Sequence, residues 1–159
     1  GMLMLRNLKV DGFEFQQAVE RGRGHLLRQN FWQAELAFRQ AETLWQGDFL
    51  AGFELEAELP YRRDEYLRQH LEQVVSLAEL LQRRREYEEA LTLLNRARRL
   101  EPTNDLLIRL LLDIYLLQGE KGAVRRLLDD YRRILREEDY DDEEIDELMT
   151  TLGPQRLGV

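Results

Sequence analysis

Few residues in this sequence have the chemistry of catalysis or metal binding. The 159-residue chain contains two histidines, His25 and His70, one serine, Ser76, and no cysteine. A histidine acts as a metal ligand or general base only beside a companion group, and neither has a carboxylate at a metal-ligand spacing. Ser76 lacks the Gly-x-Ser-x-Gly turn that exposes a nucleophile. We therefore predict that the chain is no enzyme, holds no cofactor or metal, and uses both histidines structurally or at its surface.

Phosphate binding has little support in the sequence. Gly22-Arg23-Gly24 lacks the preceding strand that a phosphate-binding loop requires. The three arginines at 83–85 have the charge to contact phosphate, but they end a predicted helix, where cations also complement the helix dipole. We prefer that plainer interpretation of the arginine run.

The negative charge of the chain is concentrated in one run. The net charge is −8, with 31 acidic and 23 basic side chains, and nine of the acidic ones lie between Glu137 and Glu147. Removing these nine leaves 22 acidic against 23 basic side chains, so the remainder is nearly neutral. It gives no electrostatic reason to expect nucleic acid or an anionic membrane as the main partner. Blocks of like charge usually stay solvated, which we expect here rather than docking to a basic surface.

The sequence shows no targeting or membrane segment. No apolar run approaches the roughly 20 residues that span a bilayer, and the N-terminus lacks the order of a signal peptide. The absence of cysteine suits a reducing compartment. We expect a cytoplasmic protein and interpret Gly1, before Met2, as the remnant of a removed tag.

The apolar pattern has the period of helices along most of the chain. Asp11 and Glu14 form a capping-box pattern that predicts the start of a first helix, which ends before a turn at Asn30. The acidic run is either a loop or the start of a last helix that reaches Leu152. Between these limits the pattern predicts helices at about 31–46, 61–84, 87–100, 105–117 and 123–136. The sequence therefore predicts an all-α chain of about seven helices.

Two segments depart from this pattern. The stretch GDFLAGFELEAELP, residues 47–60, has two glycines and a proline and is predicted to form a packed loop or short turn, in which Gly47 ends the preceding helix in the left-handed conformation. Residues 3–10, LMLRNLKV, alternate as a strand would.

Small residues recur in a frame that indicates a helical repeat. Ala34, Phe38 and Ala41 have the spacing of Ala90, Leu94 and Ala97, and residues twelve positions before each frame are also small, Gly22 and Ala78. A third frame falls on Val124, Leu128 and Tyr131, with Tyr115 at an aromatic position. Two helices cross closely only where side chains are small, and tetratricopeptide repeats are helical hairpins of about 34 residues built on this rule.

One interval does not fit a plain array. Ala34 and Ala90 are 56 residues apart, which exceeds one repeat by 22. The segment 47–60 and the long helix after it account for the excess.

This interrupted order resembles the bacterial transcriptional activator domain, the tetratricopeptide-like module of antibiotic-regulatory-protein-type transcription regulators. The resemblance rests on VDGFEFQQAVERG at 10–22, LWQGDFLAGF at 44–53, RREYEEALTLLNRARRLEP at 84–102 and LLLDIYLLQGEKGAVRRLLDDYRRIL at 110–135. It covers about residues 8–152. The chain departs from the family at Glu58 to Tyr61, where a tryptophan is usual, and at 137–144, where EEDYDDEE replaces a glycine–proline step. It therefore resembles a divergent branch.

The resemblance implies a right-handed stack of helical hairpins and a role in regulation. In the family this module follows a winged-helix DNA-binding domain, and MLMLRNLKVDGF at 2–13 resembles the last strand of such a domain running into the repeats. We expect residues 1–10 to be a tag remnant and linker, 11–152 the activator domain, and 153–159 a tail. The chain would then be a fragment or a protein without its own DNA reader.

The first helix of each hairpin is expected to line a concave groove that holds a partner. From the repeat frame, the residues facing this groove are Gln16, Arg23, Glu72, Glu79, Arg83, Arg109 and Asp113. Their mixed charge suits a polar peptide or another protein domain. The alternative is that some of them face solvent and bind nothing.

Two functions remain open on the sequence alone. The first is a regulatory protein–protein interaction module of a bacterial transcription regulator in signal transduction. Its partners would be a second copy, a sensor part of the parent or RNA polymerase, and DNA would be contacted only by a separate domain. The second is a free-standing repeat adaptor unrelated to transcription. A winged helix encoded upstream of Met2 would favour the first.

Overall fold

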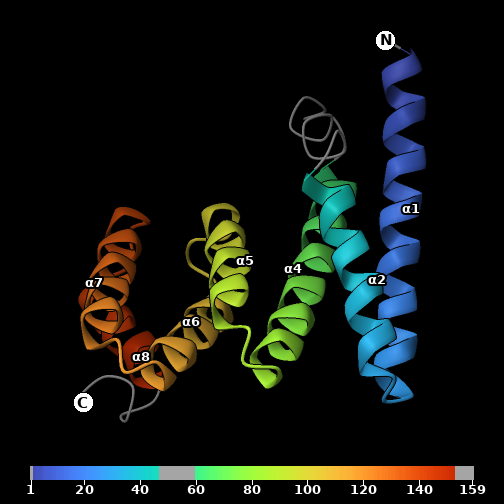
Figure 1. Cartoon of the computed structure of the whole chain (residues 1–159). Coiled ribbons are helices and arrows are strands. Elements are labelled where there is room, and N and C mark those ends of the chain that lie inside the picture. The colour runs from blue at the N-terminus through green and yellow to red at the C-terminus, as the bar shows by residue number, and fades with distance from the viewer. Residues whose placement is uncertain (1, 47–59, 153–159) are drawn as a thin grey trace. The chain divides into compact units, whose positions relative to one another are not determined.

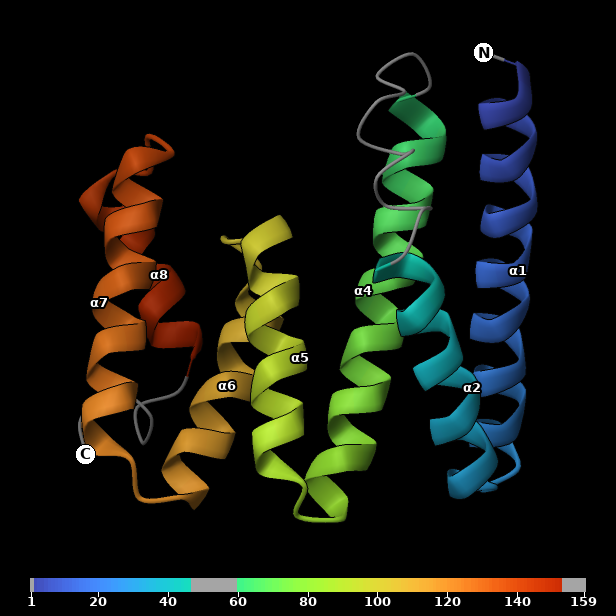
Figure 2. The same ribbon diagram turned by 45° about the horizontal axis from the view of Figure 1, so that its top comes forward.

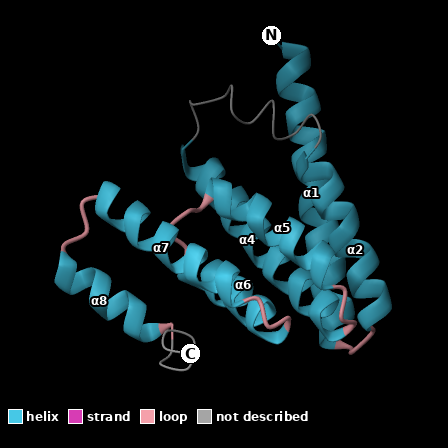
Figure 3. Ribbon diagram, turned by 60° about the vertical axis from the view of Figure 1, so that its left-hand side comes forward, coloured by secondary structure: helices cyan, strands magenta, loops and turns pink. Residues whose placement is uncertain are grey.

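The computed structural model describes residues 2–46 and 60–152, with side chains from Gly12 to Gln46 and from Arg63 to Leu152. Seven helices and no strand occur among these residues, which confirms the all-α prediction (Figures 1 and 3). The helices are α1 (Met2–Leu27), α2 (Phe31–Leu44), α4 (Pro60–Arg83), α5 (Tyr87–Leu100), α6 (Asp105–Leu117), α7 (Lys121–Glu137) and α8 (Asp142–Thr151). The predicted loop at 47–60, apart from Pro60, and the predicted helix end at Gly47 lie outside the described residues.

The start of the chain differs from the prediction. Residues 3–10 are helical rather than extended, and α1 runs without a break from Met2. Met, Leu, Arg and Lys make up most of this segment and are good helix formers, so their intrinsic preference outweighs the short apolar alternation. Asp11 lies inside α1 and does not begin it.

The acidic run contains both a turn and a helix. Asp141 precedes α8 and accepts a hydrogen bond from the backbone N–H of Glu144, while the Glu144 side chain accepts one from the backbone N–H of Asp141. This capping box satisfies two donors at the helix start, and the negative charges of the first turn suit the positive end of the helix dipole. The second of the two interpretations of the acidic run, a helix that reaches Leu152, is thus confirmed.

Contacts divide the chain into two compact units, Gly1–Arg83 and Arg84–Val159. In the first unit α2 packs against both α1 and α4, and α1 also contacts α4 (Figures 1 and 2). In the second unit each helix packs against the next, from α5 to α8. The border lies inside the predicted second repeat, because α4 and α5 fall in different units.

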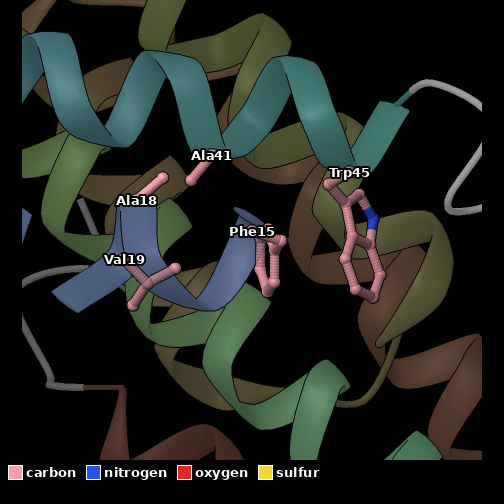
Figure 4. Packing of buried hydrophobic residues seen from close by; sticks show 5 residues of the cluster. All are labelled: Phe15, Ala18, Val19, Ala41 and Trp45. Carbon is pink, nitrogen blue, oxygen red and sulfur yellow. The ribbon is translucent and has the colours of Figure 1, made fainter. Parts of the chain in front are cut away.

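The core of the first unit lies where α1 and α2 meet. Phe15, Ala18 and Val19 of α1 are buried with Ala41 of α2 and with Trp45, which directly follows α2 (Figure 4). The rings of Phe15 and Trp45 are 5.4 Å apart between centroids. Tyr66, Leu44 and Leu67 pack against this cluster. Two large aromatic rings can pack here because the neighbouring core positions are alanines.

The small residues of the repeat frame are buried. Gly22 of α1 lies against the Phe38 ring so closely that an added Cβ would be 2.6 Å from Cδ1 and nearer still to Cε1. Ala78 and Ala90 are 1% and 0% exposed, respectively. At Gly22, therefore, the missing side chain is what lets α1 and α2 approach each other, as the repeat frame predicts.

The turns that follow α1, α4, α6 and α7 share one backbone feature. Gln29, Arg85, Gly119 and Asp139 all have positive φ, between 60° and 71°. After three of these helices the next N–H donates to a carbonyl five residues back, as in Asn30 to His25 and Glu120 to Tyr115 (2.8 and 2.9 Å). This is the helix-ending pattern that a left-handed residue permits.

The spacing of these turns reproduces the repeat frame. Gln29 and Arg85 are 56 residues apart, and Arg85 and Gly119 are 34 apart. These are the intervals that separate Ala34, Ala90 and Val124 in the sequence. The backbone thus repeats in the register that the small residues predicted, including the long interval.

Candidate partner-binding surface

The seven predicted groove residues lie on α1, α4 and α6, the first helices of the predicted hairpins. Gln16, Arg23, Glu72, Glu79 and Arg83 belong to the first unit, and Arg109 and Asp113 belong to the second. None of them is fully buried; Glu79 and Arg83 are exposed and the other five are half-buried. Each helix therefore presents its predicted residues where a partner could reach them. The partner-binding groove stays a prediction.

Arg23 and Glu72 are brought together although 49 residues separate them in sequence. The guanidinium of Arg23 on α1 donates to the carboxylate of Glu72 on α4, and it also pairs with Glu20 at 3.1 Å. Side-chain exposure of about two fifths at both Arg23 and Glu72 leaves the pair open to water. A pair this exposed adds at most about 1 kcal/mol to stability.

Arg68 extends this network along α4. Its two guanidinium nitrogens lie 2.5 Å from Glu72 and 2.6 Å from Glu65. The hydrogen bond from Arg68 is the main cause that lowers the pKa of the Glu65 carboxyl, and the same bond raises the pKa of Arg68. Both groups therefore carry their full charge near neutral pH. Basic and acidic side chains alternate across α1 and α4, so the charges on this face largely neutralise one another.

Arg83 has a local role that its place in the repeat frame did not indicate. It is the last residue of α4, and its guanidinium lies over the Phe31 ring of α2, 4.2 Å from the centroid. A cation over an aromatic face is attracted by the ring electrons. This contact fixes the end of α4 to the start of α2.

In the second unit the predicted residues follow one side of α6. Arg109 pairs with Asp105 one turn earlier, at 3.0 Å, and Asp113 follows one turn later.

Tyr131 of α7 is fully buried, and its hydroxyl has no hydrogen-bond partner in the part of the chain that the structure describes. Burial raises the pKa of Tyr131, and the negative charge of Asp105 adds to that effect.

A buried polar set between α2 and α4 was not found from the sequence. His70 Nε2 lies 3.1 Å from a carboxylate oxygen of Glu42, and its ring stacks on Trp45 with centroids 4.1 Å apart. Gln73 donates to the carbonyl oxygen of Phe38 at 3.1 Å. The prediction that His70 is structural fits this position. His70 lies seven residues, about two helical turns, before the buried Leu77, and this spacing places it on the buried face of α4. The signal was missed because histidine is polar.

Among the described residues, no group of three His, Cys, Asp or Glu side chains is placed to hold a metal ion. None of the helices in the described ranges is long and apolar enough to cross a membrane.

Comparison with known proteins connects this arrangement with one family. The family model of the bacterial transcriptional activator domain matches residues 10–152. Comparisons with curated proteins and with solved structures gave no match. The match spans nearly all of the chain, including every helix from α2 to α8 and most of α1. The chain therefore belongs to the bacterial transcriptional activator domain family.

Proposed function

We propose that this chain is the regulatory protein–protein interaction module of a bacterial transcription regulator. It acts in the cytoplasm together with a winged-helix DNA-binding domain that this chain does not contain. Family membership over residues 10–152 is the observation that carries the proposal. In this view the module transmits a signal by binding protein, and DNA is read elsewhere in the regulator.

The charged faces of α1, α4 and α6 support the choice of a polar protein partner. Replacing one member of a partly buried ion pair by a charged group of a partner costs little free energy, because water already screens the charges. A partner carboxylate can replace Glu72 beside Arg23, and a partner cation can pair with Glu79. Such exchange gives specificity and fast association more than raw affinity. The partner is a second copy of the regulator, its sensor part or RNA polymerase.

The experiment uses the intact regulator and a promoter reporter. Glu79→Arg reverses a charge that is exposed and has no ion pair among the described residues, so folding should be unaffected. We expect reporter activation to fall several-fold while promoter binding and thermal stability stay unchanged. Glu147→Arg, on the exposed side of α8 and beyond its first turn, is the matched control and should leave activation as it is.

Two results would count against the proposal. One is that the wild type, Glu79→Arg and Asp113→Arg activate the reporter equally. This result would mean that the predicted groove has no role in regulation. The other is a genomic reading frame upstream of Met2 that encodes no winged helix, which would favour a free-standing repeat adaptor instead.

A further inference from the structure

The buried contact between α2 and α4 is partly polar. Glu42 is 7% exposed, His70 4% and Gln73 0%, and we call these three residues the polar set. His70 Nε2 donates to the Glu42 carboxylate, and the Gln73 amide donates to the carbonyl oxygen of Phe38, both at 3.1 Å. Three of the four buried polar or charged side chains in the described ranges therefore meet at this one contact.

Stability alone does not account for the polar set. A buried carboxylate loses its hydration, and well-packed apolar side chains in place of a buried polar pair are often as stable or more stable. The side-chain oxygen of Gln73 is also buried, and it has no hydrogen-bond partner among the residues that the structure describes. An unsatisfied buried acceptor lowers stability further.

The apolar part of the same contact distinguishes poorly between registers of α4 on α2. Val74, Ala78 and Leu81 are buried along α4 at intervals of about one helical turn. If α4 slid along α2 by one turn, about 5.4 Å, one apolar side chain would take the place of the next. Tyr66, which lies against Gly12 of α1, favours the observed register, but it contacts a different helix.

The hydrogen bonds of the polar set define how α4 lies along α2. Phe38 and Glu42 are one turn apart on α2, and their partners Gln73 and His70 are one turn apart on α4 in the opposite order. The two helices are therefore antiparallel, and both bonds form only when the helices are in this register.

A slide of α4 by one turn in either direction is unfavourable at the polar set. In one direction Val74 takes the place of His70, and Glu42 loses the donor that the imidazole supplies. In the other direction Tyr66 takes that place, and its larger ring must enter the space of the imidazole that stacks on Trp45. Only the observed register gives Glu42 a donor of the right size.

We propose that the polar set fixes the register of α4 on α2 and contributes a unique arrangement rather than stability. Apolar cores of suitable volume keep their stability more readily than their uniqueness, whereas a buried polar pair penalises every arrangement that separates its members. Leucine at both 42 and 70 should therefore preserve the stability of the contact and relax its register. The proposal does not depend on any role in transcription.

The test measures the register with two spin labels in the full chain. The chain has no cysteine, so Gln33→Cys on α2 and Asp64→Cys on α4 place one label on each helix at exposed positions. Because the helices are antiparallel, these positions are far apart along the helix axes, and a slide of α4 changes the distance between the labels by nearly its full length. Double electron–electron resonance then reports the distribution of this distance.

The labelled wild type should give one narrow distance component. Combining Glu42→Leu with His70→Leu should add a second component displaced by about 5 Å, one helical turn. The Tm of this leucine pair in thermal denaturation should be no lower than that of the wild type. His70→Leu alone leaves Glu42 without its imidazole donor and should lower the Tm by roughly 6 °C or more.

Exchange of the two side chains is the matched control. Glu42→His combined with His70→Glu alters the same two positions but keeps one donor and one acceptor at the contact. This exchanged variant should give one narrow distance component, as the wild type does.

Three outcomes would overturn the proposal. If the leucine pair keeps the single wild-type component, apolar packing and Tyr66 fix the register without the polar set. If the leucine pair has a lower Tm than the wild type or does not fold, the polar set acts as a stabilising contact. If the exchanged variant also shows a second component, any change at these two positions disturbs the register, whichever groups they carry.

Discussion

Gly22 and Gly24 lie two residues apart on α1 and should respond in opposite ways to the same substitution. A Cβ at Gly22 would press into the Phe38 ring, which is buried and cannot turn aside. A Cβ at Gly24 would meet only the end of the Arg28 side chain, at 3.4 Å, and that side chain is long and exposed. The pair separates helix propensity from close packing.

The magnitudes follow from two opposing effects. Alanine is favoured over glycine inside a helix by about 1 kcal/mol, at both positions. Overpacking a tight contact costs about 1–3 kcal/mol, and this cost arises only at Gly22. We therefore expect Gly22→Ala to destabilise the protein by up to about 2 kcal/mol, and Gly24→Ala to stabilise it by up to about 1 kcal/mol.

Thermal unfolding followed by circular dichroism and by tryptophan fluorescence measures both changes. For a chain of this size, 1 kcal/mol corresponds to roughly 2–4 °C in Tm. Trp45 reports on the packing of the first unit, since it is fully buried in the core where α1 meets α2. Phe38→Leu, which removes part of the ring, should reduce the penalty of Gly22→Ala when the two are combined. Equal Tm shifts for the two alanine variants would refute the close approach of α1 and α2.

Three further substitutions have clear expected results. Gly119→Ala should cost about 1 kcal/mol in chemical denaturation, because φ is 71° there and no atom lies within 4 Å of an added Cβ, so only backbone strain acts. Asn104→Ala should cost about 1 kcal/mol in the same assay, because the Asn104 side chain accepts from the N–H groups of Leu106 and Leu107 at the start of α6. Tyr131→Phe should be neutral or stabilising near pH 7, because its buried hydroxyl has no described partner. The pKa of Tyr131 is raised in the folded protein, so the contribution of this residue to the free energy of unfolding is complete below the ordinary pKa of 10.0 and is lost as the pH rises above that value. In alkaline denaturation the wild type should therefore lose stability more steeply than Tyr131→Phe.

The helices of the second unit could be predicted closely because their ends have clear signals. The bounds of α5 and α6 agree with the sequence prediction, since Pro102, Asn104 and Gly119 interrupt the pattern at those points. The start of α1 was missed because an Asp followed three residues later by Glu also occurs inside helices. The left-handed turns at Gln29 and Arg85 had no sequence signal, because neither position is a glycine.

The candidate surface could be predicted only in part. The repeat frame placed Arg23 and Glu72 on first helices, yet their ion pair depends on how α1 and α4 lie together, which local sequence does not encode. The buried contact of Glu42 with His70 was missed for the same reason, since 28 residues separate them. The apolar pattern makes no prediction for Trp32, and only the structure shows that its side chain is exposed.

The border after Arg83 has a consequence for how the chain can be divided. By sequence, the shortest complete repeat is the α1–α2 hairpin. By packing, that hairpin depends on α4, which supplies His70 to Glu42 and Gln73 to the Phe38 carbonyl. In a fragment that ends after Gly47, the carboxylate of Glu42 would lose its partner His70, and the apolar side chains that α4 covers would be exposed to water. Such a fragment should aggregate. A fragment cut after Arg83 keeps all three helices and should be the smallest piece of the N-terminal half that folds alone.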